Sequence, residues 1–299
     1  MINLTIETKD TFYLLNKYSN AISKLEAEIL LCHLFNCEKI DLYVKDFSVN
    51  EGIEEQYDFL VKRRLNGEPI QYITGWTEFM GLRFIVNKDV FIPRPETELL
   101  VNEAFTAYSL QLTAVSNIQI LDLCTGSGNI AISLANHPSL RSSCVGWGGF
   151  EVVGTDISGD ALKIAEENAV LNKVSDRVKF YKGDLFNALV FDKNLKFDII
   201  ICNPPYIKEE ELAYLQKEVQ REPRMALNGR RDGLEFYRRI ACAAPNYLKK
   251  NGVLLLEIGF GHVEDIKEIF NSTNRFEIKK IVRDFAGIER ITAVGTRNL

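Results

Sequence analysis

The 299-residue sequence has few of the residues that usually hold metals or disulfides. It contains six cysteines and three histidines; the histidines are far apart, and no two cysteines form a C-x-x-C pair. The one local cluster, Cys32-His33 with Cys37, lies in an apolar helical pattern, where core packing is the ordinary role of cysteine. We therefore expect no metal site, no disulfide and a reducing, cytoplasmic environment.

Long apolar runs and a strong net charge are also missing. No stretch reaches the roughly 18 consecutive apolar residues of a membrane span, and residues 1–5 show no basic, apolar leader pattern. The net charge of −5 disfavours non-specific binding to a phosphate backbone. We expect a chain without membrane contact and without a direct nucleic-acid partner.

Two glycine-rich phosphate-binding patterns are absent. The sequence Gly126-Ser127-Gly128 is followed by Ala131 where a G-x-G-x-x-G motif has its third glycine, and there is no G-x-x-x-x-G-K-[ST] loop. A pyrophosphate site is therefore not indicated.

The first part of the sequence has the pattern of helices. Ser23 and Glu26 form a capping-box pattern ahead of an apolar helix over residues 27–35, and a second helix starts at Asn50. Gly67 and Pro69 end this second run. We interpret residues 1–70 as a small helical docking domain.

Residues 71–92 change to the alternation of strands. Segments 71–75 and 82–86 flank a glycine-containing turn, which predicts a β-hairpin linker. The proline-rich segment, residues 93–98, is expected to be extended, with Pro95 in the first turn of a helix. This stiff segment carries two carboxylates, which suit a cover over a ligand. The ordinary alternative is that it only marks the start of the domain that we place at residues 93–299.

Beyond residue 117 short apolar strands alternate with helical patterns. Strands are expected at 118–123, 151–156, 178–181, 197–202 and 253–258, helices at 158–171 and 234–249, and a final strand pair at 276–282 and 290–294. Residues 139–150 are expected to form an extended loop. The alternation predicts an α/β domain with a doubly wound, parallel sheet.

The sequence Asn203-Pro204-Pro205-Tyr206 directly follows the apolar strand at 197–202. Proline ends the strand and holds the preceding residue extended, so Asn203 lies at the carboxyl end, where ligands bind in such sheets. Its amide, the fixed carbonyls and the Tyr206 ring together suit a planar –NH2 group. A turn with an asparagine cap is the ordinary alternative.

Polar residues also follow the first three strands. The turn formed by Cys124, Thr125, Gly126, Ser127 and Gly128 permits close approach of a ligand to a helix N-terminus. Asp156 can accept two ribose hydroxyls or serve in a helix cap. Asp184 and Leu185 suit the amino edge and the face of adenine.

This order of motifs resembles the class I S-adenosylmethionine-dependent methyltransferases, and the flanking sequence resembles the HemK-type release factor glutamine methyltransferases. The matching segments are residues 71–75, 79–82, 93–98, 203–206, 222–224, 232–234 and 284–287. The sequence departs from this family at Cys124, where many relatives have glycine, and in the long segment 139–150. The resemblance covers nearly the whole chain beyond about residue 65.

The resemblance implies a Rossmann-like, mostly parallel seven-stranded sheet with a small N-terminal helical bundle joined by the hairpin. It implies methyl transfer from S-adenosylmethionine, leaving S-adenosylhomocysteine, to the glutamine amide in the Gly-Gly-Gln loop of class 1 peptide chain release factors. Asn203, Pro204, Pro205 and Tyr206 would hold the amide. Residues 124–128, Asp156, Asp184, Leu185 and Asn203 would meet the cofactor. We expect a monomer whose helical domain grips the release factor.

Three alternatives stay open from the sequence. A ribosomal-protein glutamine methyltransferase would show nearly the same motifs. A nucleic-acid amino-group N-methyltransferase would share the chemistry, although the net charge of −5 weighs against it. A non-catalytic nucleoside or release-factor binding protein would keep the fold without needing the Asn-Pro-Pro-Tyr sequence.

Overall fold

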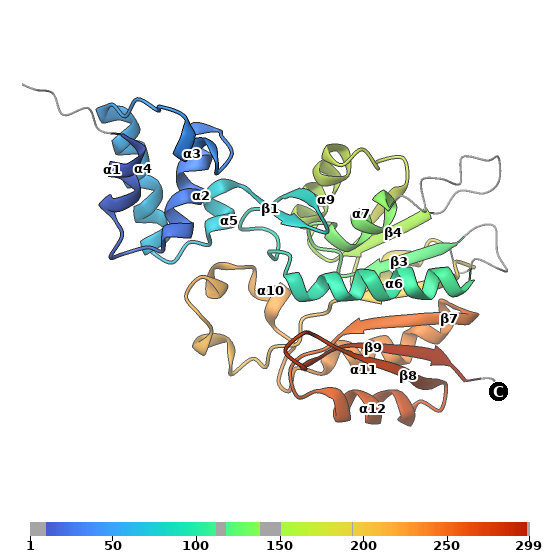
Figure 1. Ribbon diagram of the computed structural model, residues 1–299. Coiled ribbons are helices and arrows are strands. Elements are labelled where there is room, and N and C mark those ends of the chain that lie inside the picture. Colours follow the sequence, from blue (N-terminus) through green and yellow to red (C-terminus); the bar gives the residue numbers. More distant parts are fainter. Residues whose placement is uncertain (1–9, 112–117, 138–150, 193, 298–299) are drawn as a thin grey trace, which may run out of the picture. The chain divides into compact units, whose positions relative to one another are not determined.

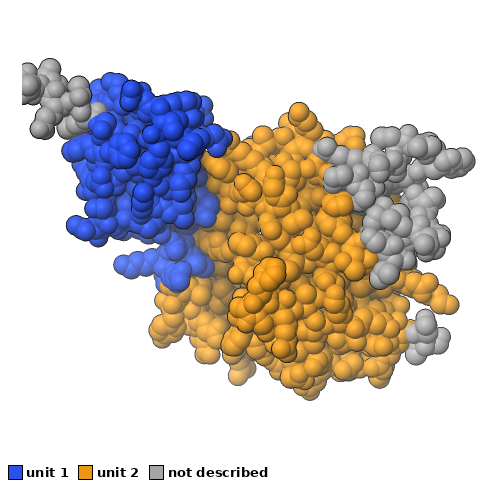
Figure 2. Space-filling model, in the orientation of Figure 1, with its two compact units in different colours: residues 1–75, 216–221 blue, residues 76–215, 222–299 orange. Residues whose placement is uncertain are grey.

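The computed structural model describes residues 10–111, 118–137, 151–192 and 194–297. The chain divides into two compact units (Figure 2). Unit 1 comprises residues 1–75 together with 216–221, and unit 2 comprises residues 76–215 and 222–299. One short segment from the second half of the chain therefore belongs to the N-terminal unit.

Unit 1 is helical. Its helices are α1 (Thr11–Lys17), α2 (Lys24–Phe35), α3 (Asp41–Val44), α4 (Glu51–Leu65) and α5 (Ile70–Thr74). The predicted capping box at Ser23 and Glu26 is confirmed, and the Asn50 side chain caps α4. The core between these helices is apolar, and Leu30, Leu31 and Tyr57 are fully buried in it.

The strand predicted over residues 71–75 is wrong, because Ile70–Thr74 forms helix α5. Pro69 precedes this single turn, and Gly75 ends it with a φ of +83°. These two residues favour a short helix, although the residues between them have the pattern of a strand. The hairpin instead pairs β1 (Trp76–Phe79) with β2 (Leu82–Ile85). Met80 and Gly81 both have positive φ, as a two-residue hairpin turn of type I′ requires.

The segment 216–221 is attached to unit 1 by polar contacts. The Arg64 guanidinium pairs with Glu26 and with Glu218, each at 2.6 Å. Arg221 donates a hydrogen bond to the carbonyl of Asn66 at 3.0 Å. Arg64 thus joins a residue of α2 to one that follows it by almost 200 positions.

Unit 2 contains a seven-stranded sheet in the order β5-β4-β3-β6-β7-β9-β8. The strands are β3 (Gln119–Leu123), β4 (Glu151–Asp156), β5 (Val178–Lys182), β6 (Phe197–Cys202), β7 (Leu248–Glu257), β8 (Phe276–Arg283) and β9 (Glu289–Thr296). The pairs among β3 to β7 are parallel, and β9 is antiparallel to both of its neighbours. The predicted, mostly parallel α/β sheet is confirmed.

Helices cover both faces of this sheet (Figure 1). One core joins α6 (Glu98–Gln111), α7 (Asn129–Asn136) and α9 (Gly159–Leu171) to strand residues such as Ile199 and Ile201. The other joins α11 (Glu235–Ala243) and α12 (Val263–Ser272) to the alternate residues, such as Ile200 and Cys202. This alternation explains why β6 is apolar throughout.

Short elements fill the connections: η1 (Pro95–Thr97), η2 (Leu185–Leu189), η3 (Leu212–Tyr214), η4 (Val219–Arg221), α10 (Arg224–Leu227) and η5 (Ala244–Asn246). The helix predicted over 234–249 is too long, because Pro245 lies in η5 and β7 begins at Leu248. The loop predicted over 139–150 lies outside the described residues. No helix in the described ranges is long and apolar enough to cross a membrane.

Candidate functional site

The parallel register brings four strand ends to one edge of the sheet. Leu123 of β3 pairs with Thr155 of β4 and Cys202 of β6, and Cys202 pairs with Leu256 of β7. Each predicted site residue at 124, 156 and 203 ends or directly follows one of these strands. The structure therefore brings the glycine turn, the Asp156 carboxylate and Asn203 to the same edge, as expected for parallel strands.

The turn after β3 uses three residues with positive φ: Cys124 at +59°, Gly126 at +55° and Gly128 at +79°. The amide of Thr125 donates to the carbonyl of Thr155 at 2.9 Å, and the amide of Gly128 donates to that of Thr125 at 2.8 Å. Cys124 thus occupies a left-handed conformation that glycine adopts without cost. This explains why glycine is suited to position 124 and shows that cysteine still permits the turn.

The buried carboxylate of Asp122 stabilises this turn, a role that the sequence analysis missed. Its Oδ2 accepts hydrogen bonds from the Thr125 hydroxyl at 2.6 Å and from the amide of Ala131 at 3.2 Å. Complete burial raises the pKa of Asp122 to about 7, because the charged form loses its hydration. A carboxylate within an apolar strand, three residues before a threonine, was the available signal.

Asp156 is tied to the same turn. Its Oδ2 accepts from the amide of Gly126 and its Oδ1 from the amide of Ser158, both at 2.9 Å. Burial raises the pKa of Asp156 against the lowering effect of these amides. Because an ionised carboxylate offers about four acceptor positions, two hydrogen bonds leave capacity for a hydroxyl pair.

Asp184 and Leu185 have partners within unit 2. Asp184 Oδ2 accepts from the Arg239 guanidinium of α11 at 2.7 Å. Leu185 has a φ of +50° and a side chain buried in the core. The amide of Gly183 donates to the carbonyl of Asp156, which places this segment beside Asp156. Contact of Asp184 and Leu185 with adenine stays a prediction.

Asn203 emerges from β6 half-buried, while Pro204 and Pro205 are buried. The Asn203 side-chain Nδ2 donates to the Thr97 hydroxyl at 3.2 Å. Among the described residues, no group donates a hydrogen bond to Asn203 Oδ1 or to the carbonyl of Pro204. Two fixed acceptors therefore lie at consecutive residues, which is what a planar –NH2 group requires.

Two glycines hold the backbone at Tyr206. A Cβ at Gly233 would lie 2.5 Å from the Tyr206 carbonyl oxygen, and one at Gly229 would lie 2.7 Å from its Cα. The Ile207 amide donates to the carbonyl of Leu227, and the Gly229 amide donates to that of Ile207. The Asn-Pro-Pro-Tyr segment is thus enclosed by close backbone packing rather than placed on an open loop.

Glu257, at the end of β7, was not identified from the sequence. Its Oε2 accepts from the Thr97 hydroxyl at 2.7 Å and its Oε1 from the Tyr206 hydroxyl at 3.4 Å. Burial raises its pKa to about 7, although Thr97, Arg290 and Tyr206 favour the charged form. A carboxylate that ends a run of three leucines was the signal.

The proline-rich segment is fixed along its length. Arg94 forms an ion pair with the buried Glu222, which also accepts from the amide of Ile92 at 3.0 Å. Thr97 meets Asn203 and Glu257, and Glu98 accepts from the amide of Met80 at 2.7 Å. Of the two carboxylates in this segment, Glu98 therefore serves the hairpin turn.

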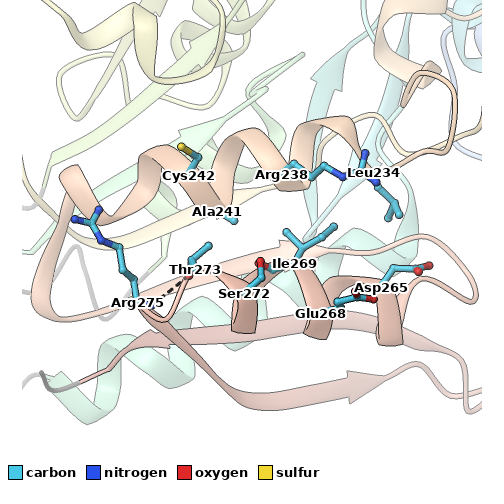
Figure 3. A pocket seen from close by; sticks show the side chains of 10 residues that line it. All are labelled: Leu234, Arg238, Ala241, Cys242, Asp265, Glu268, Ile269, Ser272, Thr273 and Arg275. Atoms are coloured by element: carbon cyan, nitrogen blue, oxygen red, sulfur yellow. Dashed lines mark hydrogen bonds between the residues drawn. The ribbon is translucent and has the colours of Figure 1, made fainter.

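No group of three or more acidic, histidine or cysteine side chains suited to a metal occurs in the part of the chain that the structure describes. A groove of about 580 Å³ lies between α11 and α12 (Figure 3). Its lining includes Arg238, Cys242 and Asp265, and it contains none of the predicted site residues. The candidate site is the sheet edge rather than this groove.

Two family models match the chain. The PrmC N-terminal domain matches residues 11–75, and a methyltransferase domain matches residues 114–284. A release factor glutamine methyltransferase of Thermodesulfovibrio yellowstonii is 39% identical over 93% of this chain and 94% of its own length. One of Chlorobaculum tepidum is 37% identical, over 89% and 88%.

Other similarities are partial. A bifunctional methyltransferase of Rickettsia typhi is 38% identical over 95% of this chain, which spans 56% of that protein. Among solved structures, the catalytic domain of hMettl16 has a TM-score of 0.53 at 17% identity, over 76% of this chain and 82% of that one, and supports the fold alone. With its two matching domains and full-length relatives, the chain belongs to the release factor glutamine methyltransferase family.

Proposed function

We propose that this chain transfers a methyl group from S-adenosylmethionine to the side-chain amide nitrogen of the glutamine in the Gly-Gly-Gln loop of class 1 peptide chain release factors. The observation that carries the proposal is the pair of acceptors, Asn203 Oδ1 and the Pro204 carbonyl, at the carboxyl end of β6. Membership of the family supports the substrate.

The residues at the sheet edge fit S-adenosylmethionine. Nothing lies within 4 Å of a Cβ built on Gly126, so the turn has room for a ligand against its backbone. The turn from Cys124 to Gly128 would hold the methionine part, and Asp156 the ribose hydroxyls. Asp184 and Leu185 would meet the adenine. When bound, the cofactor supplies a methyl group on a sulfonium that is already a good leaving group.

The chain's own contribution is to position a weak nucleophile. A glutamine nitrogen is poorly nucleophilic because its lone pair is delocalised into the carbonyl. Asn203 Oδ1 and the Pro204 carbonyl accept its two hydrogens, which fixes the –NH2 group and favours the positive charge that develops on nitrogen. Pro205 and Tyr206 pack on the amide plane. No protein nucleophile is needed for this reaction.

We further propose a cytoplasmic monomer whose unit 1 grips the release factor away from the Gly-Gly-Gln loop. Unit 1 exposes large apolar side chains, including Ile40 at 65%, Val44 at 70% and Phe59 at 61%. Val44→Asp should raise the KM for a whole release factor and leave that for a short Gly-Gly-Gln peptide unchanged. An equal effect on both substrates would assign Val44 to folding.

The substrate is tested by methyl transfer from labelled S-adenosylmethionine. Release factor, its Gln→Ala variant, ribosomal proteins and duplex DNA are assayed in parallel. Label on the wild-type release factor alone is the expected result. Label on DNA or on a ribosomal protein would keep the chemistry and replace the substrate, and cofactor binding without any transfer would indicate a binding protein.

A further inference from the structure

The hydrogen bonds behind Asn203 have a defined direction. The Glu257 carboxylate, when ionised, can only accept, so the single O–H of Thr97 points to Glu257 Oε2 at 2.7 Å. The Thr97 oxygen must then accept from its other neighbour, and Asn203 Nδ2 lies 3.2 Å away. This places the donor end of the Asn203 amide toward Thr97 and its oxygen on the other side.

We propose that Thr97 and Glu257 are positioning residues that fix the amide of Asn203 with its Oδ1 toward the substrate nitrogen. The inference rests on the proposed function, since it assigns the orientation of the group that holds the glutamine. An asparagine turned the other way would present its –NH2 to the substrate –NH2, and two donors cannot bond. The orientation therefore decides whether residue 203 can act at all.

Several observations support a built network rather than a chance contact. Thr97 and Glu257 are 1% and 3% exposed, so water cannot replace their hydrogen bonds. The second oxygen of Glu257 accepts from the Tyr206 hydroxyl at 3.4 Å. The Tyr237 hydroxyl donates to the Glu257 backbone carbonyl at 2.9 Å. The Glu257 carboxylate thus bonds Tyr206 directly and Asn203 through the Thr97 hydroxyl.

The charge of Glu257 decides which group donates and which accepts in the hydrogen bonds from Glu257 through Thr97 to Asn203. A protonated Glu257 can donate to Thr97, which frees the Thr97 O–H to donate to Asn203 Oδ1 and turns the amide over. The charged and titratable groups that face Glu257 are Glu96 from η1, Tyr206 after β6, Tyr237 on α11 and Arg290 on β9, and the Thr97 hydroxyl is its hydrogen-bond donor. Because burial raises the pKa of Glu257 to about 7, turnover should rise with pH through that region.

The decisive experiment compares Thr97→Val, Thr97→Ser and Thr292→Val. Thr292 is a buried threonine on β9 whose hydroxyl has no hydrogen-bond partner among the described residues, so its replacement by valine makes the same chemical change without breaking a bond. Thr97→Val should lower kcat by about tenfold to a hundredfold with unchanged cofactor affinity. Thr97→Ser should restore most of the rate, and Thr292→Val should leave it unaltered. Equal rates for the two valine variants would overturn the inference.

Glu257→Gln supplies a second readout, through pH. The rise of kcat near pH 7 should be present in the wild type and absent in Glu257→Gln. NMR spectra of ¹⁵N-labelled protein without substrate give a further measurement. The side-chain –NH2 signals of Asn203 are assigned as those that disappear in Asn203→Ala. Their chemical shifts should change with pH in the wild type and stay constant in Glu257→Gln. Chemical shifts that are independent of pH in both proteins would contradict the inference. Failure of the proposed function is distinguished by the wild type, which would then transfer no label to the release factor at any pH.

Discussion

The two halves of the candidate site are held in different ways. At β3 and β4 the Cys124–Gly128 turn is fixed mainly through backbone amides, since Asp122 accepts from Ala131 and Asp156 from Gly126 and Ser158. At β6 and β7 the fixing groups are side chains, with Glu257 accepting from Thr97 and Tyr206. The first half needs a particular backbone path, and the second needs particular functional groups.

This difference follows from what each half would bind. Backbone amides exist at every residue, so a turn that grips a cofactor tolerates changes in side chains that keep its φ values. A polarising contact to a reacting nitrogen depends on one oxygen at one place. We therefore expect the β6–β7 half to be far more sensitive to single substitutions.

The largest expected effect is from Asn203→Ala. Loss of one polarising acceptor costs about 2.7–4 kcal/mol in the transition state, so kcat should fall by roughly 10²–10³. Cofactor affinity, measured by calorimetry, should change little. Full turnover with unchanged cofactor affinity would show that Asn203 does not polarise the substrate.

Asp156→Ala should act on the cofactor instead. It removes the carboxylate that would accept the ribose hydroxyls and that now anchors the amide of Gly126. Loss of a charged hydrogen bond is worth about 1.5–3 kcal/mol, so the KM for S-adenosylmethionine should rise by about tenfold to a hundredfold while kcat falls less. The reverse pattern would make Asp156 a structural residue.

Asp122→Asn should change how stability depends on pH. Because the pKa of Asp122 is raised in the fold, the folded chain binds more protons than the unfolded one between about pH 4 and 7. Wild-type stability should therefore fall as pH rises through that window, by at most about 1.4 kcal/mol per pH unit for this group. Denaturant unfolding from pH 4 to 8 measures the free energy of unfolding. An unchanged slope in Asp122→Asn would contradict the raised pKa.

The smallest effect is expected from Cys124→Gly. At a φ of +59° glycine avoids a steric cost of about 1–2 kcal/mol, which its greater freedom in the unfolded chain partly offsets. The variant should be slightly more stable and nearly as active. A large loss of activity would show that the thiol itself contacts a ligand and that backbone geometry is not sufficient in this half.

Most of the fold followed from local patterns, since strands at β4 and β6 were predicted at their observed ends. The errors arose where the residues at the ends of a segment outweighed the secondary-structure propensity within it. Pro69 and Gly75 bound the helix α5 in a sequence with the pattern of a strand, and Pro245 ends the helical run of α11 early. The predicted site residues came to one edge because parallel register requires it. Thr97 and Glu257 were not assigned roles, because their meeting depends on a contact between positions 160 residues apart.

The discontinuity of unit 1 has a consequence for biosynthesis. Arg64 and Asn66 find their partners Glu218 and Arg221 only after most of the chain has been made. At about 5–20 residues per second, that interval is on the order of ten seconds or more of translation. During that interval the nascent N-terminal helices have the Arg64–Glu26 ion pair but lack the contacts to Glu218 and Arg221. Unit 1 is therefore completed only once the Asn-Pro-Pro-Tyr segment has itself been synthesised.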